Sequence, residues 1–283
     1  MSATLKDASI DKKLAADGYV VIPFLTNEEV STLKSFYYQY HPEKLEGMYA
    51  TAHVPDLDVR MKMNDFIKET FSRAISENFN HVNALGGSFI AKGKGENGTL
   101  KPHQDWNIVD EDNYRSFNIW VPLVDLKDDN GVICVMPGSH LWLKTYRSAN
   151  INSIYQNVEK ELWDKMTRLY MKAGEALVYD HRLIHASGEN ETEEIRLATV
   201  FGIIPEYAKM FYYHQKDEKT IEVYESNKEF FLFENIFEGP KKLKRVGEKA
   251  YINPTITAER LSRLENGPEQ GIMARIKSLL QIS

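Results

Sequence analysis

Hydrophobic positions recur at helical spacing in the first 83 residues. A capping-box sequence at Thr26–Glu29 predicts the start of a helix that Pro42 ends. One face of this helix carries Val30, Leu33, Phe36, Tyr37 and Tyr40. A second amphipathic helix is predicted over 59–79, and a short helix over 11–17 and a strand over 19–23 come before both. This segment therefore predicts helices that each bury one face.

From residue 84 to residue 205 the apolar runs become short and are separated by turn residues. Strands are predicted over 87–91, 116–122, 132–136, 176–179 and 196–204, and one helix over 151–166 interrupts them. Short strands at this spacing are typical of an antiparallel sandwich or jelly roll. We therefore expect a mainly β fold with flanking helices: a double-stranded β-helix (jelly-roll, cupin-like) core with the N-terminal helices packed on one sheet.

After residue 205 the pattern is mixed and unusually aromatic, with Phe211, Tyr212, Tyr213, Phe230, Phe231, Phe233 and Phe237. Core packing is the simplest explanation of this group, and the alternative is a wall of a substrate pocket. A last amphipathic helix is predicted over 271–280. We expect a single domain, with an N-terminal segment (1–83), a jelly-roll core (84–205) and a C-terminal extension (206–283) that completes or caps the core.

Composition narrows the class of protein. A chain of 283 residues with 42% hydrophobic residues can bury a substantial core. The net charge of −6 argues against a nucleic-acid partner, and the basic run Lys241–Arg245 is interpreted as a solvated loop. The single cysteine, Cys134, excludes an internal disulfide. Because no signal peptide and no membrane span are predicted, we expect a cytoplasmic protein; its oligomeric state stays undetermined.

The chemistry centres on His103 and Asp105. In an extended segment, residues two apart point to the same side, so this imidazole and this carboxylate would converge. They supply two thirds of the facial triad of two histidines and one carboxylate that holds Fe(II) and leaves other coordination positions open.

A late strand offers two candidates for the second histidine, His181 and His185. Their spacing of four also resembles a pair of zinc ligands on a helix, but position 182 is arginine where the metalloprotease motif needs glutamate. The residues before His181 also have the pattern of a strand. Both histidines remain candidates on spacing alone.

Arg196 opens the last apolar strand of the predicted core. An arginine that enters an apolar wall needs a buried anionic partner, and a carboxylate suits its paired N–H groups. A dicarboxylate that chelates a metal at one end and meets Arg196 at the other would be such a partner. The alternative is a salt bridge with Glu193 or Glu194.

Several motifs together resemble the phytanoyl-CoA dioxygenase family of iron(II)/2-oxoglutarate oxygenases. They occur in the order and near the spacing of that family and cover roughly residues 10–205: Asp17–Pro23, His103–Asp105, Trp120 with Pro122–Asp125, Asn130–Gly131, Pro137–His140, and His185–Asn190 with Arg196.

The resemblance implies a role for each matching residue. Iron would be held by His103, Asp105 and His185. The distal carboxylate of 2-oxoglutarate would be held by Arg196 and Ser187, with Trp120 lining the cosubstrate site and Ser88 near the other end. His140 would be a turn or core histidine, and His181 a pocket residue. The intact Asp105 disfavours halogenation, since related halogenases replace this carboxylate.

The resemblance further implies an enzyme that uses Fe(II), 2-oxoglutarate and O₂ to hydroxylate a C–H bond of a small-molecule substrate. The alternatives are desaturation, ring formation or epimerisation at the same iron, and a non-catalytic jelly roll that only binds a ligand. A secondary metabolite, an amino-acid derivative or an acyl compound would suit the family. Its pocket is expected to involve Tyr49, His53, Gln104, Trp106 and His181.

Overall fold

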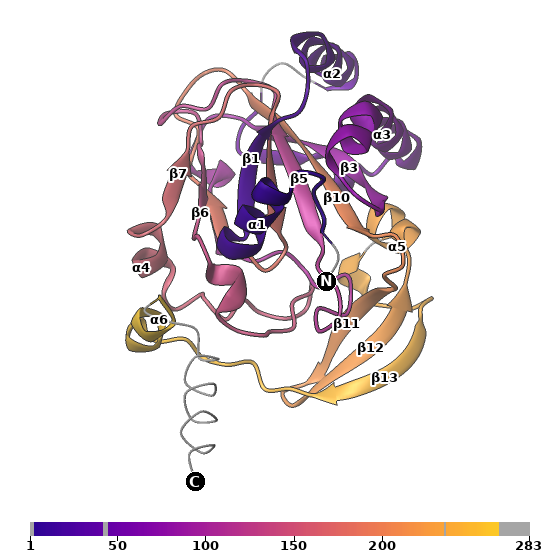
Figure 1. Ribbon diagram of the computed structural model, residues 1–283, viewed down its shortest axis with the longest axis vertical. Coiled ribbons are helices and arrows are strands. Elements are labelled where there is room, and N and C mark those ends of the chain that lie inside the picture. Colours follow the sequence, from indigo (N-terminus) through magenta and orange to yellow (C-terminus); the bar gives the residue numbers. More distant parts are fainter. Residues whose placement is uncertain (1–2, 42–44, 235, 266–283) are drawn as a thin grey trace.

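The computed structural model describes residues 3–41, 45–234 and 236–265. Three antiparallel sheets and their flanking helices make up this part of the chain (Figure 1). The helices are α1 (Ala8–Asp17), α2 (Asn27–Tyr40), α3 (Leu57–Asn78), α4 (Glu159–Trp163), α5 (Lys228–Phe233) and α6 (Ala258–Glu265), with 3₁₀ turns η1 (Thr51–His53), η2 (Glu96–Gly98), η3 (Ser139–Leu141) and η4 (Ile236–Glu238).

Two of the sheets form the jelly roll. The six-stranded sheet has the order β1 (Tyr19–Pro23), β8 (Glu175–Asp180), β5 (Phe117–Pro122), β10 (Arg196–Pro205), β3 (Val82–Lys92), β2 (Met48–Ala50). The four-stranded sheet has the order β4 (Leu100–His103), β9 (His185–Ser187), β6 (Ile133–Val135), β7 (Thr167–Leu169). The expected mainly β jelly roll with flanking helices is therefore confirmed.

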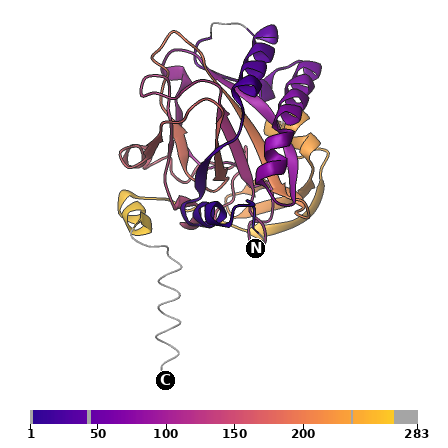
Figure 2. The ribbon, with the colours of Figure 1, turned by 45° about the horizontal axis from the view of Figure 1, so that its top comes forward.

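Helices α2 and α3 cover the outer face of the six-stranded sheet. Both views place them on the opposite side of the molecule from α4 and α6 (Figures 1 and 2; Figure 2 is the turned view). The predicted capping box is present, since the Thr26 side chain accepts from the backbone N–H of Glu29 and the Glu29 side chain from that of Thr26. α2 ends at Tyr40, and Gly18 ends α1 with a φ of 82°.

The side chains of β10 point alternately to the hydrophobic core and to the candidate site. Leu197 and Phe201 point outward into the core under α2 and α3, whereas Ala198 packs in the cluster between the two sheets. β5 alternates in the same way, with Ile119 facing the helices and Trp120 facing the interior. Residues two apart on these strands, including Arg196 and Asn118, are thereby directed to the inside of the jelly roll.

Two predictions for this part of the chain are wrong. Only Glu159–Trp163 of the helix expected over 151–166 is helical. Short polar side chains compete for the backbone before it, as when the Ser153 hydroxyl accepts from the N–H of Tyr155 at 3.2 Å. The basic run at 241–245 is not a loop throughout, because β13 begins at Lys244.

The C-terminal extension forms a third sheet, which the sequence did not predict. Its order is β11 (Met210–Asp217), β12 (Thr220–Ser226), β13 (Lys244–Ala250). The helix predicted over 271–280 lies outside the described residues. In the described part of the chain, no helix is both long and apolar enough to cross a membrane.

Candidate metal centre and cosubstrate cavity

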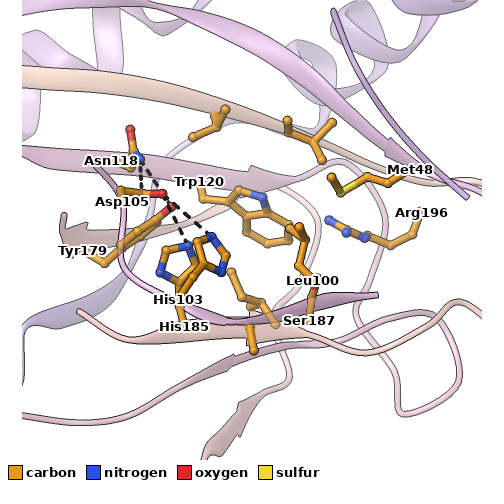
Figure 3. A pocket seen from close by; sticks show the side chains of 14 residues that line it. Met48, Leu100, His103, Asp105, Asn118, Trp120, Tyr179, His185, Ser187 and Arg196 are labelled. Atoms are coloured by element: carbon orange, nitrogen blue, oxygen red, sulfur yellow. Dashed lines mark hydrogen bonds and ion pairs between the residues drawn. The ribbon is translucent and has the colours of Figure 1, made fainter. Parts of the chain in front are cut away.

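Two histidines and one carboxylate converge inside the jelly roll. His103 ends β4, Asp105 follows two residues later, and His185 begins β9, which pairs with β4 so that the two histidines are direct partners. The Oδ1 atom of Asp105 lies 3.9 Å from Nε2 of His103 and 3.8 Å from Nε2 of His185. One ligand atom from each of the three residues lies within 4.8 Å of the other two, so the group can hold a metal ion (Figure 3).

Backbone carbonyls set the tautomer of both histidines. Nδ1 of His103 lies 2.7 Å from the carbonyl oxygen of Lys101, and Nδ1 of His185 lies 3.0 Å from that of Leu183. A carbonyl oxygen only accepts, so we assign the proton of each neutral ring to Nδ1. Each Nε2 then presents its lone pair toward the centre of the group, as a metal ligand requires.

Asn118 orients the carboxylate. Its side-chain amide donates to Oδ2 of Asp105 at 2.7 Å and lies 3.3 Å from the Tyr179 hydroxyl. Oδ1 of Asp105 is left to face the two histidines. The backbone is also fixed, because the guanidinium of Arg147 donates to the carbonyl oxygen of Asp105 at 2.7 Å while pairing with Glu111.

The protonation states suit a metal site. Burial acts to raise the pKa of Asp105, but the positive charges that His185, His181 and His103 can carry, together with the bond from Asn118, lower it to about 2. Burial lowers the pKa of His185 to about 4. At neutral pH the group therefore offers an ionised carboxylate and, at His185, a neutral imidazole.

A cavity of about 200 Å³ extends from this group to Arg196. Trp120 lies between the two ends of the cavity in Figure 3, with the guanidinium carbon of Arg196 5.2 Å from the centre of its ring. Arg196 is 2% exposed, and its Nε has no hydrogen-bond partner in the described part of the chain. The alternative salt bridge is wrong for Glu193, whose carboxylate pairs with Lys94, and no described contact joins Glu194 to Arg196. Burial lowers the pKa of Arg196 to about 10.

A second buried cation, Lys92, stands beside Arg196. The two residues are direct partners in the pairing of β3 with β10, and Lys92 is fully buried. Its ammonium donates to the hydroxyl of Ser187 at 2.6 Å, to the carbonyl oxygen of Ser187 at 3.2 Å and to that of Gly188. Burial, and next the charge of Arg196, lowers the pKa of Lys92 to about 6.

A second cavity, of about 270 Å³, adjoins the first and shares Asn118 and Val200 with it. Its other lining residues lie on several elements: α3 with Arg60 and Asn64, η1 with Thr51 and Ala52, β3 with Gly86, Gly87 and Ser88, β10 with Gly202, and α5 with Phe231, Leu232 and Phe233. Trp106 also lines it. The guanidinium of Arg60 donates to the carbonyl oxygens of Val54, Leu232 and Phe233, so it ties α5 to α3 and the loop before it.

The aromatic group after residue 205 divides between the two interpretations. Tyr212, Tyr213 and Phe230 are buried in core clusters, as the simpler interpretation predicted. Phe231 and Phe233 line the second cavity, as the alternative predicted.

Several sequence-predicted pocket residues lie elsewhere. Ser88 lines the second cavity instead of the first, because it lies one step further along the inward face of β3 than Ile90, which lines the first. Tyr49 and His53 line neither cavity; Tyr49 contacts His41 and His53 contacts Phe237. Gln104 lines a third, polar hollow next to His103, and Trp106 lines both this hollow and the second cavity.

His181 is separated from His185 by a turn between β8 and β9, so the helical zinc arrangement is wrong. It lines neither of the two cavities; its Nδ1 lies 2.9 Å from the Ser116 hydroxyl. His140 is buried, with Nε2 3.2 Å from the carbonyl oxygen of Ala15 in α1, as expected for a core histidine.

Sequence reasoning did not identify Asn118, Lys92 or Arg147 as residues of the metal and cosubstrate site. The signal for Asn118 was present: it is a polar residue in the apolar run Phe117–Pro122, at the same side as Trp120. Lys92 and Arg147 gave no comparable signal, because their partners are far away in the sequence.

A jelly roll with a 2-His-1-carboxylate group at its centre defines a class of protein, the mononuclear non-haem iron oxygenases. The family model described as "Phytanoyl-CoA dioxygenase (PhyH)" matches residues 14–198, and the chain belongs to this family. The family expected from the motifs is thus confirmed. It is a family of 2-oxoglutarate-dependent non-haem iron dioxygenases.

Individual relatives are distant. A dioxygenase of Aspergillus terreus, trt7, is 24% identical over 184 residues, 60% of this chain and 60% of that protein. A phytanoyl-CoA dioxygenase of Arabidopsis thaliana is 28% identical over 152 residues, 53% of this chain and 54% of that protein. The chain therefore spans little more than half the length of these curated relatives.

Among solved structures, the fold is similar to that of the "non-heme alpha ketoglutarate dependent carbocyclase SnoK from nogalamycin biosynthesis". The TM-score is 0.50 at 15% identity, over 73% of this chain and 86% of that one. At this identity the similarity concerns the fold alone.

Proposed function

We propose that this protein is an Fe(II)- and 2-oxoglutarate-dependent dioxygenase that hydroxylates a C–H bond of a small molecule. The observation that carries the proposal is a buried arginine, Arg196, without a carboxylate partner among the described residues, at the opposite end of one cavity from a group of metal-ligand type. A buried charge of this kind is costly unless an anion meets it. 2-Oxoglutarate has a keto acid for the metal and a distal carboxylate for Arg196.

The residues fit the iron site in their chemistry. His103 and His185 would bind through Nε2 and Asp105 through Oδ1, and this donor set suits Fe(II). Bound together, iron and 2-oxoglutarate supply the oxidation, in which O₂ is consumed and succinate and CO₂ are released. The protein holds the histidine tautomers and orients Asp105 through Asn118, and Trp120, Ser187 and Arg196, which line the same cavity, would hold the cosubstrate.

The test is an anaerobic titration of the metal-free protein with Fe(II) and then 2-oxoglutarate, followed by visible absorption. We expect a weak charge-transfer band that needs both additions. If iron binds but 2-oxoglutarate produces no band, the cosubstrate role is wrong, and a protein that only binds a ligand becomes the better description.

The prime substrate is proposed to enter the second cavity, because this cavity adjoins the first at Asn118 and Val200. Ser88→Leu would fill part of it. We expect this variant to retain the charge-transfer band but to lose any substrate-stimulated release of succinate, whereas the exposed Ser72→Leu on α3 retains both. Loss of the band in Ser88→Leu would assign the cavity to the cosubstrate instead.

The outcome of the oxidation is a separate question, since the same iron-binding residues serve hydroxylation, desaturation, ring formation and epimerisation. SnoK, which shares the fold, is by its title a carbocyclase. Product analysis by mass distinguishes a gain of one oxygen atom from a loss of two hydrogen atoms or an unchanged formula.

A further inference from the structure

Lys92 is an unusual residue for the inside of a jelly roll. It is fully buried, and among the described residues neither it nor its cross-strand partner Arg196 forms an ion pair with a carboxylate. Like charges directly opposite each other on a sheet repel, and burial strengthens that repulsion. Burial and the charge of Arg196 lower the pKa of Lys92 to about 6, so its charged form needs an anion nearby.

The chain makes room for this lysine. A Cβ atom at Gly131 would lie 2.7 Å from Cδ of Lys92, and one at Gly98 would lie 3.1 Å from its Cγ. The stem of Lys92 thus passes between two glycines and reaches from β3 in the six-stranded sheet to β9 in the four-stranded sheet. Such a passage indicates a defined position for the ammonium group.

The bonds of that ammonium determine what Ser187 can do. All three N–H groups of a protonated Lys92 have an acceptor: the hydroxyl and carbonyl oxygens of Ser187 and the carbonyl oxygen of Gly188. The Ser187 hydroxyl accepts from Lys92, so its own proton is free to be donated elsewhere. Ser187 lines the cavity that Arg196 also lines, so an acceptor placed there can receive this proton.

We propose that Lys92 is a positioning residue of the cosubstrate site, which directs the Ser187 hydroxyl toward the distal carboxylate of 2-oxoglutarate and thereby makes the site selective for a dicarboxylate. This inference rests on the proposed function. Lys92 does not touch the cosubstrate; it acts only through Ser187. The bound carboxylate in turn relieves the repulsion between Lys92 and Arg196.

The experiment compares two ligands that differ only at the distal end. 2-Oxovalerate has the keto acid of 2-oxoglutarate but a methyl group in place of the distal carboxylate. The dissociation constants of both are measured anaerobically with Fe(II) from the charge-transfer band. Thermal stabilisation of the Mn(II)-loaded protein by each ligand is a second readout. The variants are Lys92→Met and, as a matched control, Lys94→Met, whose lysine is exposed and pairs with Glu193.

We expect Lys92→Met to weaken the binding of 2-oxoglutarate by about 10- to 100-fold, which is the range for a lost hydrogen bond to a charged group. Binding of 2-oxovalerate should stay within about twofold. Lys94→Met should change neither. Ser187→Ala should show the same selective loss, and the double variant Lys92→Met with Ser187→Ala should lose no more than Ser187→Ala alone.

If Lys92→Met weakens the binding of both ligands equally, or of neither, the role of Lys92 is overturned and the proposed function stays intact. An absent band in the unaltered protein would overturn both. If Lys92→Met does not fold, Lys92→Gln, which keeps a donor for Ser187 but removes the charge, is measured together with Ser187→Ala. Absence of a selective loss in Ser187→Ala, or a selective loss in Lys92→Gln despite the donor that it keeps, then overturns the inference.

Discussion

Replacing Asn118 with alanine tests how the carboxylate ligand is oriented. In the structure the Asn118 amide donates a hydrogen bond to Oδ2 of Asp105 at 2.7 Å, which is the distance of a charge-assisted hydrogen bond. Without it, Asp105 can rotate and present either oxygen to the metal. Loss of such an outer partner typically weakens metal binding by about 10- to 100-fold, or about 1.4–2.8 kcal/mol.

The structure favours the lower end of this range. The Asp105 side chain is 26% exposed, so water can replace part of the lost bond. The backbone of Asp105 is also held independently by Arg147. We therefore expect Asn118→Ala to weaken the binding of Mn(II), a redox-stable substitute for iron, by about tenfold. The signal of free Mn(II) in electron paramagnetic resonance gives the dissociation constant directly.

Tyr179 is the residue that can compensate. Burial raises the pKa of its hydroxyl well above the usual value, so it stays protonated and can donate to Asp105 once Asn118 is gone. The double variant Asn118→Ala with Tyr179→Phe should therefore bind Mn(II) more weakly than Asn118→Ala. Asn83→Ala, which removes an amide bonded to a surface carbonyl, is the control. Unchanged Mn(II) affinity in the double variant would refute the reasoning.

Three further outcomes are expected. Asp105→Ala or His185→Ala should abolish the release of succinate while circular dichroism stays unchanged; normal succinate release in either would remove that residue from the metal site. Arg196→Met should raise the 2-oxoglutarate concentration for half-maximal turnover by about 100-fold with little change in kcat, since a paired contact to a carboxylate is lost; an unaltered requirement contradicts its role. Burial acts to raise the pKa of Asp180, but the hydrogen bonds and charge of Arg182, and then the charge of Arg115, outweigh it and lower the pKa. The ionised carboxylate therefore stabilises the fold above about pH 4, and this stabilisation is lost as the pH falls through the folded pKa of Asp180. Asp180→Asn should therefore cost about 3–5 kcal/mol at pH 7 in urea unfolding, and the difference from the unaltered protein should shrink below pH 4; a constant difference would show that charge is not the cause.

The sequence was sufficient for the central residues of the site because their relation is local. Residues two positions apart in an extended segment point to the same side, so His103 and Asp105 converge wherever that segment lies in the fold. The strands β5, β8 and β10 were also predictable, since each is an apolar run bounded by turn residues. Their alternation directs Trp120 and Arg196 to the interior.

What depends on pairing between distant segments was not predictable. Lys92 matters because β3 pairs with β10 in a register that sets it against Arg196, and a single sequence does not contain that register. Ser88 was expected near one end of the cosubstrate, but it lines the second cavity instead of the first. The third sheet was missed because its strands mix aromatic and charged residues on a half-exposed surface.

The anchoring of α5 by Arg60 has an evolutionary consequence. Arg60 holds the main-chain carbonyls of Leu232 and Phe233, so the anchor does not depend on which side chains α5 carries. The match to the family model ends at residue 198, before Val200 of β10 and before all of α5. One wall of the second cavity can therefore diversify by mutation or by exchange of the C-terminal extension while the iron-binding residues are inherited unchanged. Related enzymes that share this oxidation but differ in what they oxidise would be expected to differ first in this region.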